Sequence, residues 1–373
     1  MNFPRTLLGA IAATALIGAA TAASAAGTSL LDGIKKHSTV GSSVPDNGDQ
    51  NPYALMVAPV SAGAIQKDDL LVDNFNDANN LQGLGTTIMD YRPSTKNWST
   101  FAKLPRQLDG CPGGVGLTTA MTMLKSGWVI VGSTPSTDGT TATKGAGCLI
   151  VLDNTGKVAA VWNGPDINGP WGNMAVKDDG NAATLFISMA GFGLQAPTDD
   201  SPVLNNATIL RLKLDIADGK APVIASRQVV GSGFSNQADK NVFLIGPTGL
   251  ALADDGTLYA SDAIKNQIVA IKDALTRTDS AGTGTSVTQG GFMKRPLALC
   301  MMANGHLLST NGLNGQVVEI DPASGQQLSA RWIDADKAQT PPGSGDLFGI
   351  AVAPSGKGFY YVEDDNNTVV IAE

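Results

Sequence analysis

The sequence predicts an all-β protein, a six-bladed β-propeller with four antiparallel strands in each blade. One observation is a phrase that recurs six times, most clearly as GLALADDGTLYASD at 249–262 and ALCMMANGHLLSTN at 298–311. The other is composition: 44 Gly, 19 Pro and only 16% charged residues are typical of many short strands joined by turns. Because the copies continue to the end of the chain, we expect one domain over 51–373.

Each copy of the phrase reads as an antiparallel hairpin. A compact residue comes first and a large one second, which is the alternation of a strand with two unlike faces. The compact residues are Ala54, Ala120, Asn173, Gly249, Ala298 and Gly349. Five copies then place a Gly where a tight turn needs positive φ. A third strand follows the hairpin, as at 267–273, and a fourth follows that, as at 328–334.

The N-terminus reads as a targeting segment. Arg5 precedes an apolar run over 7–20, and Ala23-Ser24-Ala25 offers the small residues that signal peptidase accepts. We therefore expect a signal peptide over 1–26, a periplasmic or secreted protein, and no stable membrane insertion after cleavage. Residues 27–50 form a polar leader, a candidate for the outermost strand of the last blade.

One blade carries a family resemblance. The segment GPTGLALADDGTLYASDAIKNQIVAI at 246–271 resembles an NHL repeat, with a Pro and Gly before the first strand, a Gly turn and an apolar third strand. The resemblance implies an NHL or TolB-like six-bladed propeller. That superfamily includes metal-dependent lactonases and esterases, amidating lyases and non-catalytic binding proteins, so the fold alone does not choose the function.

Cysteine and histidine limit the chemistry. Cys111 and Cys148 both belong near the face where the first strands begin, so a disulfide between them is one alternative and two free thiols the other. Cys300 occupies a usually small position of an inner strand and reads as a buried hydrophobe. The only histidines are His37 in the leader and His306, which reads as a solvated turn residue. Histidine-dependent hydrolase or lyase chemistry is therefore disfavoured.

Oxygen donors define the candidate metal site. A resemblance to regucalcin-like and gluconolactonase-like propellers implies one divalent cation, often calcium, held in the central channel by Glu, Asn and Asp. Here the candidate ligands are Asn173, Asp346 and Asn51. The Glu of that pattern is missing from the segments before the first strands. For Asn173 the alternative is a side chain that bonds strand ends at the channel mouth.

Charge and loop lengths indicate the partners. With 25 Lys and Arg against 33 Asp and Glu, the net charge is -8, so a nucleic-acid partner is not expected. Long connections at 134–147, 190–206, 231–245 and 335–346 belong to the face where the first strands begin, which we call the top face. Apolar residues in or beside these loops are Phe192, Leu194, Phe234, Phe243 and Phe348. Long loops gathered on one face commonly carry binding function.

Two functions remain after these exclusions. The one that the sequence favours is a non-catalytic binding module, which holds a protein, peptide, glycan or small ligand on the top face. The alternative is an enzyme, a calcium-dependent lactonase or esterase in which Asn173, Asp346 and Asn51 hold the metal that polarises a carbonyl.

Overall fold

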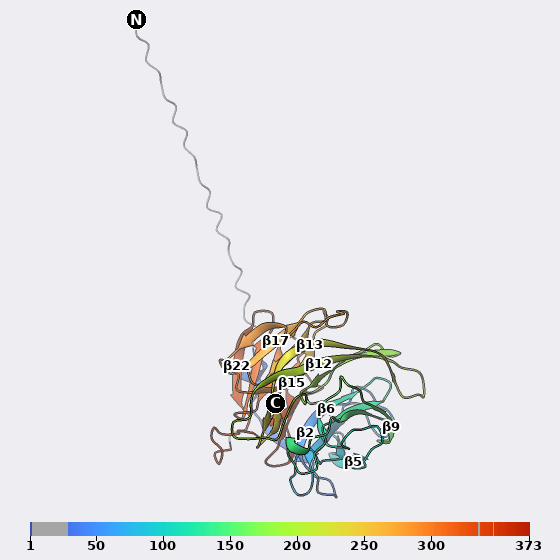
Figure 1. Ribbon diagram of the computed structural model, residues 1–373. Coiled ribbons are helices and arrows are strands. Elements are labelled where there is room, and N and C mark those ends of the chain that lie inside the picture. Colours follow the sequence, from blue (N-terminus) through green and yellow to red (C-terminus); the bar gives the residue numbers. More distant parts are fainter. Residues whose placement is uncertain (2–28, 335, 346) are drawn as a thin grey trace.

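The computed structural model describes residues 1, 29–334, 336–345 and 347–373, and it confirms the predicted fold class. Six sheets of antiparallel strands surround a central axis as the blades of a β-propeller (Figure 1). Only two short helical segments accompany the strands in this part of the chain, α1 (Leu30–Gly33) and the 3-10 turn η1 (Thr141–Thr143). In the same residues, no helix is long and apolar enough to cross a membrane.

The blades follow one another along the chain. Blade 1 contains β2 (Gln50–Val57), β3 (Leu70–Asn76), β4 (Thr87–Arg92) and β5 (Asn97–Lys103). Blade 2 contains β6 (Leu117–Met123), β7 (Val129–Ser133), β8 (Cys148–Leu152) and β9 (Val158–Trp162). Blade 3 contains β10 (Ala175–Asp178), β11 (Ala182–Met189), β12 (Leu204–Asp215) and β13 (Val223–Asp239), extended by β14 (Phe243–Ile245).

The second half of the ring repeats this plan. Blade 4 contains β15 (Pro247–Leu252), β16 (Leu258–Asp262), β17 (Gln267–Ile271) and β18 (Thr285–Gln289). Blade 5 contains β19 (Pro296–Met301), β20 (Leu307–Asn311), β21 (Gln316–Asp321) and β22 (Gln326–Trp332). Blade 6 contains β23 (Leu347–Val352), β24 (Phe359–Glu363) and β25 (Thr368–Ala372), and its fourth strand is β1 (His37–Ser42).

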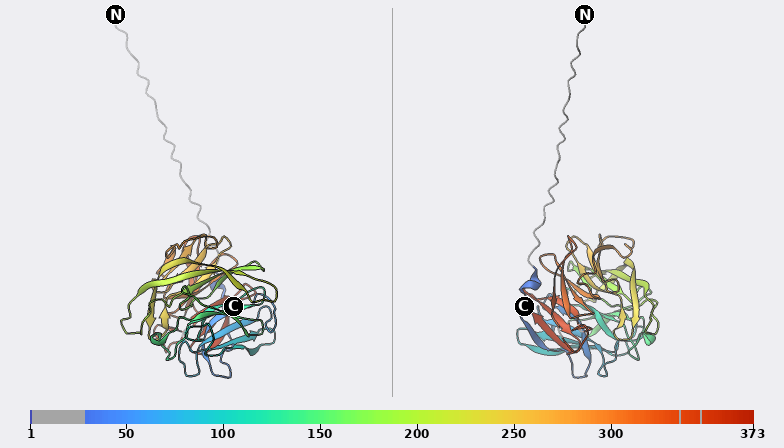
Figure 2. Two further views of the ribbon diagram at one scale, coloured as in Figure 1. Left: turned by 45° about the vertical axis from the view of Figure 1, so that its right-hand side comes forward. Right: turned by 90° about the vertical axis from the view of Figure 1, so that its left-hand side faces the viewer.

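The leader closes the ring. β1 pairs antiparallel with β25, from His37 opposite Ala372 to Ser42 opposite Thr368. The N–H groups of Lys35 and Lys36 donate to Glu373 O at 2.8 and 2.9 Å, so the leader and the C-terminus lie side by side (Figure 2). The predicted signal peptide over 1–26 lies almost entirely outside the described residues.

Close packing around the axis explains the compact first position of the repeat. A Cβ added to Gly249 would lie 2.3 Å from Leu297 O of the next blade, and one added to Gly349 would lie 2.8 Å from Tyr53 O. Only a very small residue tolerates such contacts. The second strands reinforce the packing, because Ser261 Oγ accepts from Gly249 N–H and donates to Leu297 O at 2.7 Å.

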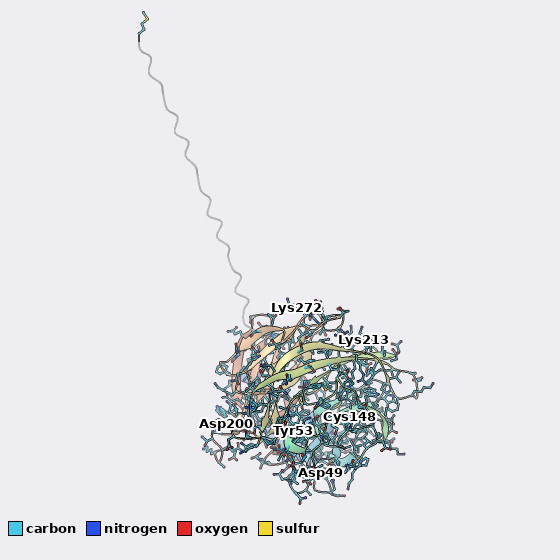
Figure 3. All side chains as sticks on the ribbon, viewed as in Figure 1. Asp49, Tyr53, Cys148, Asp200, Lys213 and Lys272 are labelled. Atoms are coloured by element: carbon cyan, nitrogen blue, oxygen red, sulfur yellow. A yellow bond between two sulfur atoms is a disulfide. The ribbon has the colours of Figure 1, made fainter. Side chains whose placement is uncertain are left out.

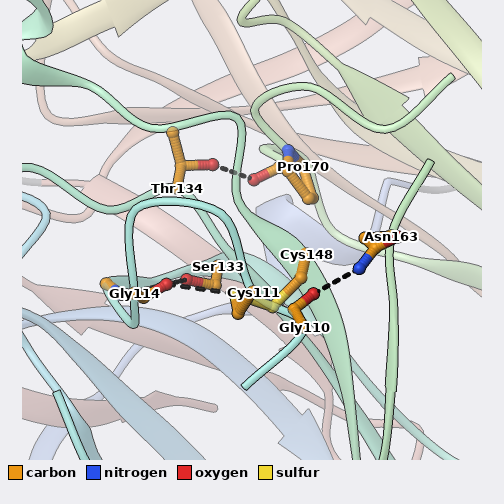
Figure 4. The surroundings of a disulfide bond; sticks show 9 residues. Gly110, Cys111, Gly114, Ser133, Thr134, Cys148, Asn163 and Pro170 are labelled. Atoms are coloured by element: carbon orange, nitrogen blue, oxygen red, sulfur yellow. Dashed lines mark hydrogen bonds between the residues drawn. A yellow bond between two sulfur atoms is a disulfide. The ribbon is translucent and has the colours of Figure 1, made fainter. Parts of the chain in front are cut away.

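A disulfide ties the top of blade 2. Cys111 lies in the loop before β6 and Cys148 at the start of β8, and their sulfur atoms are bonded with the Cα atoms 5.1 Å apart (Figure 4). Of the two alternatives that the sequence left open, the structure contains the bridge. Beside it, Ser133 Oγ donates to Gly114 O at 3.0 Å, which fixes the same loop to β7.

Candidate functional site

A pocket lies at the top mouth of the central channel, and we call it the mouth pocket. Inner-strand residues form its walls and the β13–β14 hairpin covers one side. The lining residues are Tyr53, Trp171, Val242, Leu244, Ile245, Thr248, Arg295, Leu297, Gly312, Gly345 and Phe348. Blades 1, 3, 4, 5 and 6 thus all contribute to one site, blade 3 through β14 and through Trp171 before its first strand.

The rings of Tyr53, Trp171 and Phe348 line this pocket, and Phe75 and Phe243 pack behind them. Tyr53, labelled in Figure 3, packs against the rings of Phe75, Trp171 and Phe348 with centroids 4.7, 5.6 and 4.1 Å away. Phe243 of the hairpin stacks on Trp171 at 6.0 Å and meets Phe75 edge-on at 5.5 Å. We call these five residues the aromatic cluster. Such a wall suits a flat or apolar ligand body.

The mouth pocket is narrow. Its volume is about 350 Å³ when the open mouth is included, but only about 20 Å³ is wide enough for the centre of a water molecule. That space accommodates one or two waters or a small substrate group. A larger ligand body must therefore lie in the open mouth or displace the hairpin.

A carboxyl group with an unusual pKa stands near this pocket. Asp364 follows β24 and is half-buried, and its carboxylate has no hydrogen-bond partner among the described residues. Burial, aided by the charge of Asp365, raises the pKa of Asp364 to about 7. Such a group gains and loses its proton near neutral pH, as a general base or acid must.

The charge of Asp364 acts on the phenol of Tyr53, which lines the mouth pocket. Burial raises the pKa of Tyr53 well above its usual range, and the charge of Asp364 is the next largest cause. The Asp364 carboxylate is therefore close enough to the Tyr53 ring to act on its ionisation. Since the phenol stays protonated, Tyr53 can donate a hydrogen bond at neutral pH.

The pocket also contains a positive charge. Arg295 precedes β19 and is half-buried, and burial lowers its pKa while the carboxylate of Asp239 and the phenol of Tyr53 oppose that shift. Asp239 belongs to the β13–β14 hairpin, where its Oδ1 accepts from Asn241 and Val242 N–H at 2.8 and 3.1 Å. The hairpin thus brings a carboxylate to the edge of the site.

Two of the three predicted calcium ligands, Asn173 and Asn51, lie within the described residues, and the two amides make no contact with each other there. Asn173 lies inside the channel with its amide fully bonded: Nδ2 donates to Leu250 O and Leu299 O at 2.7 and 3.2 Å, and Oδ1 accepts from both N–H groups at 3.1 and 3.2 Å. It joins blades 3, 4 and 5, as the non-metal alternative for this residue described. Asn51 is buried at the boundary of blades 1 and 6, and its Oδ1 has no partner among the described residues. Asp346 lies outside the described residues.

Asn173 and Asn51, the two candidate ligands that the structure describes, do not by themselves fit a calcium ion. Calcium takes six to eight oxygen ligands, with carboxylates among them. Within 29–334, 336–345 and 347–373 no three His, Cys, Asp or Glu side chains are grouped so that they could hold a metal. Asn173 Oδ1 already accepts two hydrogen bonds, and one unpartnered amide oxygen, that of Asn51, is not a metal site.

The histidines and the free cysteine lie elsewhere. His37 Nδ1 is 3.2 Å from the Tyr361 hydroxyl at the ring closure. The expectation of a solvated His306 is wrong, because its side chain is only 13% exposed and its Nδ1 lies 2.7 Å from Oε1 of the buried Glu319. Cys300 and Asn173 both line a hollow in the channel with about 330 Å³ that the centre of a water molecule can occupy, and burial raises the pKa of Cys300 to about 12. None of the three reaches the mouth pocket.

Comparisons with known proteins agree with the architecture. No protein-family model and no curated protein matches the sequence. Among solved structures, regucalcin from Agrobacterium tumefaciens, named as a calcium-binding protein, is 14% identical with a TM-score of 0.53, over 89% of this chain and 93% of that one. A gluconolactonase from Xanthomonas campestris is 15% identical with a TM-score of 0.50, over 90% and 88% of the two chains. A putative glucose dehydrogenase from Thermus thermophilus is 13% identical with a TM-score of 0.52, over 91% and 99%.

These findings correct the functional prediction. The non-catalytic module for a protein, peptide, glycan or small ligand is contradicted, because the similar propellers include a gluconolactonase and a putative oxidoreductase and so favour the enzyme alternative. At 13–15% identity the likeness itself establishes the fold. With no family model matched, the NHL or TolB-like label stays a prediction.

Proposed function

We propose that this propeller is a hydrolase of small esters or lactones, and that the mouth pocket is its active site. The observation that carries the proposal is the half-buried carboxyl group of Asp364, whose pKa is about 7 and whose charge acts on the protonated phenol of Tyr53 in the lining of the mouth pocket. A poised base and a proton donor are the two groups that ester hydrolysis needs. The shared fold of a gluconolactonase supports the same reaction class.

The proposed reaction assigns one role to each residue. Ionised Asp364 accepts a proton from water as its oxygen attacks the substrate carbonyl carbon. The Tyr53 hydroxyl donates to the carbonyl oxygen, where negative charge develops in the tetrahedral intermediate. When the carbon–oxygen ester bond breaks, the proton held by Asp364 passes to the departing alkoxide, so the products are a carboxylic acid and an alcohol. Because the described donors do not fit calcium, no step is assigned to a metal.

The first test is substitution of the base. In Asp364→Asn we expect kcat/KM for an activated aryl ester or a lactone to fall by about a hundredfold to ten-thousandfold, which is the usual contribution of a general base. Wild-type activity should rise with pH through about 7, because the base acts only when it is ionised. Asp365→Asn should keep the activity, but the rise in activity should occur at lower pH, because the charge of Asp365 raises the pKa of Asp364.

Two outcomes would overturn the assignment. If Asp364→Asn hydrolyses the aryl ester or lactone as fast as the wild type, another group is the base. The assignment also fails if a chelator abolishes activity and calcium restores it, with bound metal found by elemental analysis. That result would replace the Asp364 mechanism with a metal-dependent one.

A further inference from the structure

The guanidinium of Arg295 differs from those of the other described arginines. Within 29–334, 336–345 and 347–373 its side chain makes no hydrogen bond or ion pair. The others all bond a carboxylate or a carbonyl oxygen through the guanidinium: Arg92, Arg106, Arg211, Arg227, Arg277 and Arg331. The charge of Asp239 acts on Arg295 only through space, and a half-buried cation without a directly bonded anion is costly unless a ligand supplies one.

The backbone holds Arg295 in place in a conformation that an ordinary residue avoids. Its φ is +57°, in the left-handed region. Arg295 N–H donates to Asn266 Oδ1 at 2.6 Å, and Arg295 O accepts from Gly312 N–H at 2.8 Å. These bonds fix a strained residue at the pocket wall. Strain at a binding wall is a common feature of functional sites.

The surroundings select the kind of anion. Tyr53, Trp171 and Phe348 share the pocket lining with Arg295, so few water molecules compete for its N–H groups. The planar guanidinium fork matches a carboxylate through two parallel hydrogen bonds. Asp239 and Asp364 are near enough to the site to influence Arg295 or Tyr53, and their negative charge disfavours a dianion such as a phosphate more than a monoanion.

We propose that Arg295 binds the carboxylate of an acidic ligand whose flat or apolar body lies against Tyr53, Trp171 and Phe348 in the pocket lining. The substrate class that follows rests on the proposed function. If the protein is a hydrolase, its substrate is an ester or lactone that carries a separate carboxylate. Arg295 then orients the substrate, with its scissile carbonyl toward Tyr53 and Asp364.

Benzoate is a suitable probe, because it joins a carboxylate to a flat apolar ring, and benzamide is its neutral counterpart. Calorimetric titration should show that the wild type binds benzoate and that Arg295→Gln weakens this binding by about tenfold to a hundredfold, as expected for hydrogen bonds to charged groups. Arg295→Lys should bind benzoate more tightly than Arg295→Gln but less tightly than the wild type, because an ammonium group cannot make the two parallel hydrogen bonds of a guanidinium. Lys294→Gln is the matched control, because it removes the same charge from the exposed neighbouring residue, and it should bind as the wild type does.

Several results would overturn the inference. It fails if the wild type does not bind benzoate up to about 10 mM, an affinity below roughly 3 kcal/mol. It also fails if benzamide binds as tightly as benzoate, if Arg295→Gln and Arg295→Lys both bind benzoate unchanged, or if inorganic phosphate binds more tightly. Asp364→Asn separates the two proposals: its benzoate affinity should be retained even though its hydrolysis is lost. An enzyme that hydrolyses neutral and acidic esters equally well would refute the substrate class but leave the hydrolase standing.

Discussion

Asp90 shows how a single buried carboxyl group makes stability depend on pH. It lies in β4, is 4% exposed, and its Oδ1 has no partner among the described residues. Burial and the charge of Asp69 raise the pKa of Asp90 to about 7, although Arg92 lies 3.8 Å away and opposes the shift. The folded protein therefore prefers the protonated form of this side chain.

The sign of the pH effect follows from that preference. In the unfolded chain Asp90 ionises near its usual pKa of 3.8, whereas in the folded protein it stays neutral up to about pH 7. The free energy of unfolding contributed by this group is present below pH 3.8, decreases as the pH rises toward 7, and is lost above it. Asp90→Asn cannot ionise, so at pH 8 it should be more stable than the wild type by about 1–3 kcal/mol.

Urea unfolding at pH 4 and pH 8 checks this prediction. The difference between Asp90→Asn and the wild type should be small at pH 4 and should favour the variant at pH 8. Asp254→Asn, which removes an exposed carboxylate in the β15–β16 turn, is the control and should show little pH-dependent difference. A variant that is no more stable than the wild type at pH 8 would show that Asp90 is already ionised in the folded protein without penalty.

At the residue scale the repeat contained more information about the site than its compact first position. The residue just before that position is Tyr53, Thr248, Leu297 or Phe348 in four of the blades, and all four line the mouth pocket. An alignment that starts one residue earlier would have identified them. Arg295 carries no comparable sequence pattern, because its environment is created by segments far apart in the chain.

At the element scale the hairpin of each blade was predictable from the sequence, but the β13–β14 hairpin beside the mouth pocket was not. Period-two alternation and turn glycines predict each two-stranded unit from local sequence. The extension of β13 into a hairpin with β14 depends instead on tertiary contacts, such as Gln82 Nε2 donating to Asn241 O at 2.6 Å and the packing of Phe243 in the aromatic cluster. The sequence singled out Phe243 as a top-face residue, but not its partners Phe75 and Trp171.

Phe243 provides a test of this hairpin. It is 1% exposed and has a φ of +66°, so its ring stabilises the fold while its backbone is strained. Phe243→Ala should lower the free energy of unfolding by about 3–5 kcal/mol through lost aromatic burial. Phe243→Gly should be more stable than Phe243→Ala by about 1 kcal/mol, because glycine adopts positive φ without strain.

The order of these two variants is the informative result. In an ordinary strand a glycine variant is less stable than an alanine variant. Thermal or urea unfolding that finds Phe243→Ala more stable than Phe243→Gly would therefore contradict the left-handed backbone at this position. Losses well under 1 kcal/mol in both variants would show that the ring does not belong to the aromatic cluster. Val223, 58% exposed at the start of β13, provides a control substitution to alanine with little expected effect.

At the scale of the whole molecule, ring closure joins the two ends of the described chain. β1 pairs with β25, α1 packs on β22, and Leu31 is fully buried among residues of blades 5 and 6. Ser29 Oγ and Leu31 N–H donate to Oε2 of the buried Glu319 at 2.6 and 3.1 Å. The sequence suggested the leader as a closing strand because the last copy of the repeat ends after three strands, but the anchoring at Glu319 had no sequence pattern.

Closure should therefore stabilise every blade, and removing it should affect the whole molecule. A chain that begins at residue 43 keeps Asp49, whose carboxylate accepts from Thr86 and Thr87, but loses α1 and β1. Compared with a chain that begins at residue 28, it should lose at least about 3 kcal/mol of unfolding free energy from lost apolar burial and strand pairing. The exposed edge of β25 should also make the shorter chain associate, since an unpaired strand edge pairs with other chains.

Urea unfolding measures the loss of stability, and light scattering measures the association. Leu31→Ala in the longer chain isolates the contribution of α1 to the free energy of unfolding, about 2–5 kcal/mol. If the shorter chain unfolds at the same urea concentration and stays monomeric, then β1 is not what closes this propeller.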